Sequence, residues 1–170
     1  LFYVACTRAK THLELLHPEM ARDRYRVDVL LDPSRFLLEI PSGFDWILGT
    51  VFHSFVYSAS HELYTAGRVR AGDVVLLHSA AGAIGAMAAQ IAKTAGATVV
   101  GLCSPAKFDF ARANGVDHVF SSSDPDWPGR VVDATGGHGA DLIIDGIAGP
   151  DAPRNFAASA PLGQVIYMGA

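Results

Sequence analysis

The sequence predicts an α/β fold, namely a Rossmann-like open parallel sheet of about five strands with flanking helices, plus an appended N-terminal segment. From residue 73 to the end, short apolar runs alternate with stretches of helical spacing. The runs lack polar alternation, which is typical of strands buried on both faces. The turn "SAAGAIG" joins the first apolar run to a helix-like stretch, as in a nucleotide-binding βαβ unit.

The first half of the sheet follows from turn signals and periodicity. "DVVLLHS" follows the turn "RAGD" and predicts a strand over 73–78. "GAIGAMAAQIAKTAG" has small and apolar residues at helical spacing and predicts a helix that ends at Gly96. "ATVVGLCS" predicts the second strand, and a strand–helix–strand order implies parallel pairing through a right-handed crossover.

The second half repeats this order. "SPAKFDFARANG" predicts a helix with Ser104 as N-cap, Pro105 at the first position and Gly115 as its end. "VDHVFSS" and "ADLIIDGIAG" predict the third and fourth strands, with a helix in "PDWPGRVVDATGG" between them. "DAPRNFAASAP" predicts a further helix and "GQVIYMGA" the fifth strand.

Composition narrows the class of protein. Half of the 170 residues are apolar, yet no apolar run approaches the roughly 20 residues that cross a membrane. A net charge of −4 argues against a nucleic-acid surface. Cys6 and Cys103 lack metal spacing, and His53 and His61 have no third ligand at metal spacing, so we expect no metal site. Free thiols suit a reducing compartment, so we expect a cytoplasmic protein.

The chain changes character near "EIPSGFD". Residues 1–41 carry dense, balanced charge, whereas Gly, Ala and Val dominate 42–170. This shift predicts two segments with a boundary near Pro41. Because Leu1 is not an initiator Met, we expect a fragment or a processed product.

The glycine turn predicts a dinucleotide site. In such a sheet the ligand crevice lies beyond the carboxyl ends of the strands. Ala80, Gly82 and Gly85 occupy the three glycine positions of G-x-G-x-x-G. Gly82 would let the backbone approach a pyrophosphate, Gly85 would let the helix pack closely on the strand, and the helix N-terminus would face the phosphates. A tight turn without a ligand is the alternative.

The second strand indicates which dinucleotide. NAD sites usually place an acid about 20 residues after the glycines, bonded to the ribose 2′-hydroxyl. "GLCSPAK" holds no acid, but it brings a hydroxyl at Ser104 and an ammonium at Lys107. These groups favour a 2′-phosphate, and therefore NADP(H). The alternative for Lys107 is a solvated helix lysine.

The segment 42–170 resembles a known family. The stretch from "GRVRAGDVVLLHSAAGAIG" to "SSSDPDW", with "TGGHGADLIIDGIAG" and "PLGQVIYMGA", resembles the nucleotide-binding half of the zinc-free quinone oxidoreductases of the medium-chain dehydrogenase/reductase superfamily. "GTVFHSFVYSASHELYTAGRV" resembles the helix that precedes it. The resemblance implies NADPH-dependent hydride transfer to a quinone or an activated enone.

The resemblance also implies cofactor-binding residues. They are Ala81, Gly82, Ala83, Ile84 and Gly85 at the pyrophosphate; Ser104 and Lys107 at the 2′-phosphate; Ser122 near the adenine, where the family often has Tyr; Gly146, Ile147 and Ala148 after the fourth strand; Met168 and Gly169 near the nicotinamide; and Tyr57, Ser58 and Ser60 on its other side. It assigns no catalytic residue.

The family resemblance leaves two functions open. The family has a substrate domain before this segment and a return segment after it, and we recognise neither in the sequence. The chain is therefore either an NADPH-binding oxidoreductase module, incomplete as it stands, or a non-catalytic nucleotide-binding or helicase-derived interaction fragment. The edge beyond the fifth strand could pair two copies into a homodimer.

Residues 1–41 resemble a different family. "YVACTRAK" resembles the sixth motif of superfamily 1 DNA helicases of the UvrD/Rep type, and "PSRFLLEIP" resembles the end of their motor. The resemblance implies that Arg8 matches an arginine that reaches the ATP γ-phosphate. No G-x-x-x-x-G-K-[ST] occurs, so we expect neither helicase nor ATPase activity. A fusion remnant is the alternative for this segment.

Overall fold

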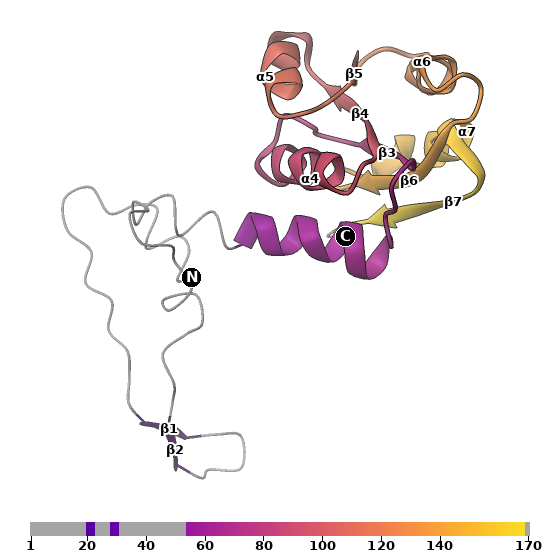
Figure 1. Ribbon diagram of the computed structural model, residues 1–170. Coiled ribbons are helices and arrows are strands. Elements are labelled where there is room, and N and C mark those ends of the chain that lie inside the picture. The colour runs from indigo at the N-terminus through magenta and orange to yellow at the C-terminus, as the bar shows by residue number, and fades with distance from the viewer. Residues whose placement is uncertain (1–19, 23–27, 31–53, 169–170) are drawn as a thin grey trace. The chain divides into compact units, whose positions relative to one another are not determined.

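The computed structural model describes residues 20–22, 28–30 and 54–168. The chain divides into two units, Leu1–Ser54 and Phe55–Ala170, and each is described by itself. In the first unit, β1 (Met20–Arg22) pairs antiparallel with β2 (Asp28–Leu30), with Met20 opposite Leu30 (Figure 1). The helicase-like motifs and Arg8 lie outside the described residues, so that expectation stays a prediction.

The second unit is built on a five-stranded sheet in the order β5-β4-β3-β6-β7. Its strands are β3 (Val74–Leu77), β4 (Thr98–Cys103), β5 (His118–Ser121), β6 (Ala140–Asp145) and β7 (Ser159–Tyr167). Every pairing is parallel, with Leu76 of β3 beside Val100 of β4 and Ile143 of β6. The predicted Rossmann-like sheet is confirmed.

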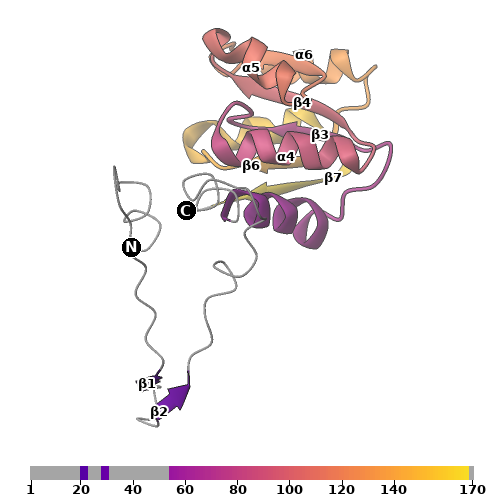
Figure 2. The same ribbon diagram turned by 60° about the vertical axis from the view of Figure 1, so that its left-hand side comes forward.

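Helices cover both faces of this sheet (Figures 1 and 2). Residues 54–60 are α-helical and continue as the π-helical turn η1 (His61–Ala66). The other helical elements are α4 (Ala83–Thr94), η2 (Pro105–Lys107), α5 (Phe108–Ala113), α6 (Trp127–Ala134), η3 (Gly149–Arg154) and α7 (Asn155–Ala158). No helix of the described residues is long and apolar enough to cross a membrane.

Two hydrophobic clusters form the core, one on each face. Because successive strand residues point to opposite faces, Val75 and Leu77 join the cluster under α4 and η1, whereas Val74 and Leu76 join the cluster under α6. Trp127 anchors the second cluster. All four residues of β3 are buried, as predicted for a strand without polar alternation.

The helix predicted after Ser104 begins later than expected. Pro105–Lys107 forms a 3-10 turn, the α-helix starts at Phe108, and the Ser104 hydroxyl makes no capping hydrogen bond. Lys107, at φ −113° and ψ 8°, departs from α-helical geometry and separates the turn from the helix. The predicted end is correct, since Gly115 has a φ of +95°.

The helix predicted in "DAPRNFAASAP" is largely wrong. Gly149–Arg154 is a 3-10 helix and only Asn155–Ala158 is α-helical, since Pro150 and Pro153 lack the amide hydrogens that an α-helix needs. The fifth strand begins at Ser159 and not at Gly163. A register shift between Ala140 and Leu142 absorbs the extra residues of β7.

Candidate dinucleotide-binding site

The turn after β3 is fixed by its neighbours on both sides. The His78 amide donates to the Ile144 carbonyl of β6 over 3.0 Å, and the Ala80 amide donates to the Leu102 carbonyl of β4 over 3.1 Å. Between them Ser79 has a φ of +50°, which is rare for a residue with a side chain. The chain therefore leaves β3 in a defined direction at the carboxyl edge of the sheet.

Gly85 lets helix α4 approach this turn closely. A Cβ at Gly85 would lie 2.4 Å from the Ser79 carbonyl oxygen and 2.9 Å from the Cα of Ala80, both backbone atoms. At Gly82 the corresponding distance to the Ser79 oxygen is 3.1 Å. The close-packing role predicted for Gly85 thus has a geometric basis.

The N-terminus of α4 suits an anion. Ala86 donates to the Gly82 carbonyl over 2.9 Å, so the amides of Ala83, Ile84 and Gly85 precede the first intrahelical bond. The first turn carries no acidic residue. Free amides and the positive end of the helix dipole together favour a phosphate here.

A pocket of about 150 Å³ opens beside this helix end. It is lined by Ser79, Ala81, Gly82, Leu102, Cys103, Ser104, Lys107, Ser122 and Ile147. The structure thus brings together Ala81, Gly82, Ser104, Lys107 and Ser122, which the sequence assigned to the pyrophosphate, the 2′-phosphate and the adenine. The lining residues include a lysine and no carboxylate.

Local hydrogen bonds shape the far side of the pocket. The Lys107 amide donates to the Ser104 carbonyl over 2.9 Å, which closes the 3-10 turn that follows β4. The Ser122 amide donates to the Cys103 carbonyl over 3.1 Å and holds the end of β5 against β4. Burial raises the pKa of the Cys103 thiol, although Lys107 and Arg112 partly oppose this, so the pocket wall stays uncharged there.

Other predicted residues lie around the pocket. Gly146 and Ala148 belong to the loop after β6, next to Ile147. The Met168 methyl group lies 3.1 Å from where a Cβ at Gly146 would stand, and the Met168 amide donates to the Asp145 carbonyl over 3.0 Å. Gly169 lies outside the described residues.

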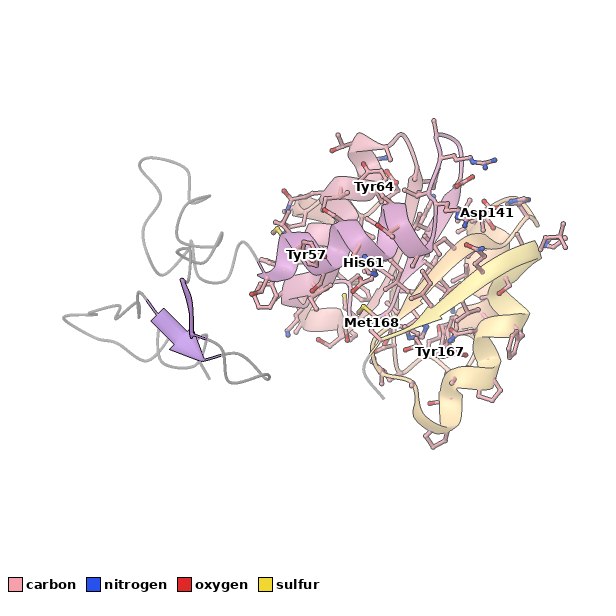
Figure 3. The ribbon with its side chains drawn as sticks, turned by 90° about the horizontal axis from the view of Figure 1, so that it is seen from below. Tyr57, His61, Tyr64, Asp141, Tyr167 and Met168 are labelled. Atoms are coloured by element: carbon pink, nitrogen blue, oxygen red, sulfur yellow. The ribbon has the colours of Figure 1, made fainter. Side chains whose placement is uncertain are left out.

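The predicted residues on the helix 54–60 do not line this pocket. Tyr57 and Ser58 lie on that helix, which runs beside β7, and Figure 3 shows Tyr57 on the helix and Met168 at the end of the strand. The structure therefore places them near the end of β7 and not with Ser104 and Lys107. Their predicted nicotinamide-side role stays a prediction.

Sequence reasoning gave no cofactor-binding role to three lining residues, namely Ser79, Leu102 and Cys103. They contribute to the pocket because each stands at the carboxyl end of a central strand or just beyond it. This position was a usable signal, since ligands of such sheets bind there.

Asp145 holds the loop that follows β6. Its Oδ1 accepts hydrogen bonds from the amides of Ile147 and Ala148, each over 2.9 Å. Burial acts to raise the pKa of this carboxyl, but those two amides, Asn155 and nearby His78 outweigh it and hold the pKa below its usual value. Asp145 is therefore a charged group that fixes backbone.

A parallel sheet with a glycine turn and a lysine-bearing pocket at its carboxyl edge is typical of a dinucleotide-binding domain, and the similar solved structures make it the nucleotide-binding half of a medium-chain dehydrogenase/reductase. Residues 83–170, more than half of the chain, match the family described as zinc-binding dehydrogenase. The chain belongs to this family.

Three solved structures are similar to the chain. The enoyl reductase CurK is 27% identical, with a TM-score of 0.73, and the match covers 77% of this chain and 40% of that one. A quinone oxidoreductase of Pseudomonas syringae is 27% identical (TM-score 0.72, coverage 76% and 40%). A mycobacterial protein solved with NADPH is 26% identical (TM-score 0.72, coverage 77% and 41%), which supports the NADP(H) prediction.

A curated relative places this similarity within much larger proteins. Mycoketide-CoA synthase of Mycobacterium tuberculosis is 30% identical over 137 residues, which are 79% of this chain and 3% of that protein. The chain thus spans well under half of the length of the relatives that it matches. The predicted superfamily is confirmed, and the finer assignment to quinone oxidoreductases is a matter of proposal.

The described residues do not fit the zinc that the family's description implies. Within 20–22, 28–30 and 54–168, no group of three or more His, Cys, Asp or Glu side chains could hold a metal ion. Cys103, the one described cysteine, is buried in the pocket wall. We therefore assign no step to a metal.

Proposed function

We propose that this chain provides the NADPH-binding half of an oxidoreductase that reduces an activated enone. The observation that carries the proposal is the pocket beside α4, where Lys107 and Ser104 face the glycine turn and no carboxylate lines the wall. Bound NADPH would supply a hydride there. The chain's own residues would bind its phosphates, orient it and exclude water.

The preference for NADPH over NADH follows from charge. A 2′-phosphate brings about two negative charges, which Lys107 would attract and a carboxylate would repel. The Ser104 hydroxyl adds a hydrogen-bond donor. We expect NADPH to bind at least about tenfold more tightly than NADH, as measured by fluorescence titration of the full chain.

The Lys107→Ala variant tests the assignment of this preference. It should weaken NADPH binding about tenfold and leave NADH binding unchanged, since only NADPH carries the 2′-phosphate. Lys93→Ala is the matched control, because Lys93 pairs with Asp117 and does not line the pocket. Equal affinity for the two dinucleotides, or an unchanged preference in Lys107→Ala, would contradict the cofactor assignment.

An activated enone is favoured over a quinone by the relatives. They include an enoyl reductase and a polyketide synthase as well as a quinone oxidoreductase. NADPH oxidation should be followed with a small enone and a small quinone in parallel. Faster turnover of the enone supports the proposal, and turnover of the quinone alone overturns the choice of substrate class.

A non-catalytic nucleotide-binding module is the second candidate. It agrees with the pocket, whose lining residues suit the binding of phosphates and include none to which we assign a catalytic step. Tight NADPH binding with no reduction of either acceptor would support this candidate.

For residues 1–41 we propose no ATPase activity. The basis is the sequence, which contains no phosphate-binding G-x-x-x-x-G-K-[ST] loop to hold the nucleotide that Arg8 would contact. ATP hydrolysis stimulated by single-stranded DNA would overturn this proposal.

A further inference from the structure

Three buried polar side chains meet behind the pocket. His78 follows β3, Asp145 ends β6 and Asn155 begins α7, so three separate elements contribute. The His78 side chain is only 11% exposed, and Asp145 and Asn155 are buried. A buried polar cluster is costly unless its hydrogen bonds are made, which points to a specific arrangement.

The hydrogen bonds in this cluster have a defined direction. Asn155 Nδ2 donates to Asp145 Oδ2 over 2.8 Å, because a carboxylate can only accept. Asn155 Oδ1 is then the acceptor that lies 2.7 Å from His78 Nε2, so this ring nitrogen must carry a hydrogen. On the other side, Asp145 Oδ1 receives the amides of Ile147 and Ala148. A continuous relay therefore runs from His78 to the backbone of the pocket loop.

Both ends of the relay reach strained backbone at the pocket. Ser79, directly after His78, has a φ of +50°, and Ala148 has a φ of +51°. Such conformations are strained for residues with a side chain and persist only where the surroundings determine them. Ser79 and Ile147 line the pocket, so the relay holds one residue in each of two pocket walls.

Trp127 packs against the imidazole of His78 and helps to fix its orientation. Its ring meets the His78 ring edge to face, with the centroids 5.3 Å apart and the planes at 87°. Trp127 is itself buried in the second core cluster. The orientation of His78 is therefore determined by packing as well as by Asn155.

We infer that His78 and Asn155 are positioning residues that hold the loop 146–148 and the turn at Ser79 in the geometry that binds the dinucleotide. They act through Asp145 and contact no ligand themselves. The inference rests on the proposed NADPH site and adds to it the residues that keep that site in shape.

Two substitutions of His78 separate the relay from simple packing. The Gln amide of His78→Gln can reach the place of Nε2 and donate to Asn155, whereas the shorter amide of His78→Asn reaches only the place of Nδ1. Both variants are polar and smaller than histidine. We expect His78→Asn to bind NADPH about fivefold more weakly and His78→Gln to bind as the wild type does.

Hydrogen exchange measures how well the loop 146–148 is protected in the absence of any ligand. The Ile147 and Ala148 amides should exchange about tenfold faster in His78→Asn than in His78→Gln or the wild type, at matched thermal stability. Asn155→Leu, which replaces the amide of the other member of the relay by an apolar group with the same branching, should reproduce the effect. His138→Asn is the control. His138 is exposed, its Nε2 lies 2.9 Å from Asp141 Oδ1, and neither residue belongs to this loop.

The outcomes distinguish the inference from the proposed function. Weaker NADPH binding and faster exchange in His78→Asn and Asn155→Leu, with rescue by His78→Gln, support the inference. If the wild type binds NADPH and these variants bind it with unchanged affinity, the inference is overturned and the proposed function stands. The same holds if both His78 variants lose affinity equally. If the wild-type chain fails to bind NADPH, the proposed function is overturned and the inferred role of the relay with it.

Discussion

Glu62 is an exception to the usual pairing of buried charges. It is 7% exposed on the π-helical turn η1, and its Oε2 has no hydrogen-bond partner among the described residues. A carboxylate without a partner is poorly stabilised in such surroundings, and burial raises the pKa of Glu62 to about 7. The folded chain therefore favours the neutral form of this side chain.

The Glu62→Gln variant should change how stability depends on pH. A raised pKa gives stability that is complete below the unfolded value of 4.5 and is lost as pH rises to about 7. We expect the variant to be more stable than the wild type at pH 8, by at most about 3 kcal/mol in the free energy of unfolding, and about as stable at pH 4.5. Thermal unfolding across this range measures the difference.

The exposed Asp133→Asn variant is the control for Glu62→Gln, because it also replaces one carboxylate by an amide. Its effect should not vary over the same pH range in the way predicted for Glu62→Gln. A constant difference between wild type and Glu62→Gln from pH 4.5 to 8 would contradict the role of burial.

Single residues were predictable where they act through local chemistry. Lys107, Ser104 and Gly82 follow predicted strands at the carboxyl edge, and the structure gathers them in one pocket. Asn155 was not predictable, because its partners His78 and Asp145 are 77 and 10 residues away. Nothing in its local sequence shows that α7 would bring it between two strand ends.

At the scale of elements, the contact between β3 and α4 depends on Gly85. Gly85→Ala should destabilise the second unit by about 2 kcal/mol, because the new methyl group would meet backbone atoms of Ser79 and Ala80 that cannot move aside. The midpoint of urea unfolding measures this change. Gly146→Ala is the matched control, since its methyl group would meet only the flexible end of Met168. Equal destabilisation in the two variants would show that the close approach is unimportant.

The elements that the sequence placed wrongly share a physical cause. The strands β3, β4 and β6 are apolar on both faces and were found close to their true bounds. The region 149–163 was not, because Pro150 and Pro153 shorten the helix and the small residues carry no clear period. The start of β7 is set by pairing with β6 across the register shift, which local sequence does not encode.

At the scale of the whole second unit, the sheet separates two tasks. The carboxyl edge holds the pocket and the relay, whereas the faces hold the two core clusters. Substitutions at the edge should therefore affect binding more than folding, and core substitutions the reverse. Gly85 contributes to both binding and folding, because it lies at the helix end that faces the pocket and packs closely on the turn after β3.

The outer edge of β7 gives the last prediction. Among the described strands β7 pairs only with β6, and its residues Leu162 and Tyr167 are exposed. Unpaired backbone beside apolar side chains favours pairing with a second copy. We expect the chain to form a homodimer, observed as a concentration-dependent mass in sedimentation velocity.

Tyr167→Lys should shift this equilibrium toward the monomer, because edge charges oppose strand pairing between two copies. Phe156→Lys is the control, since it also replaces an exposed aromatic residue by lysine but lies on α7 and not on the edge strand. A monomeric wild type at all concentrations, or an equal shift in both variants, would contradict dimerisation through β7. Retained NADPH binding in monomeric Tyr167→Lys would show in addition that the pocket works within one copy, as its lining by β4 and by the loops after β3, β4, β5 and β6 implies.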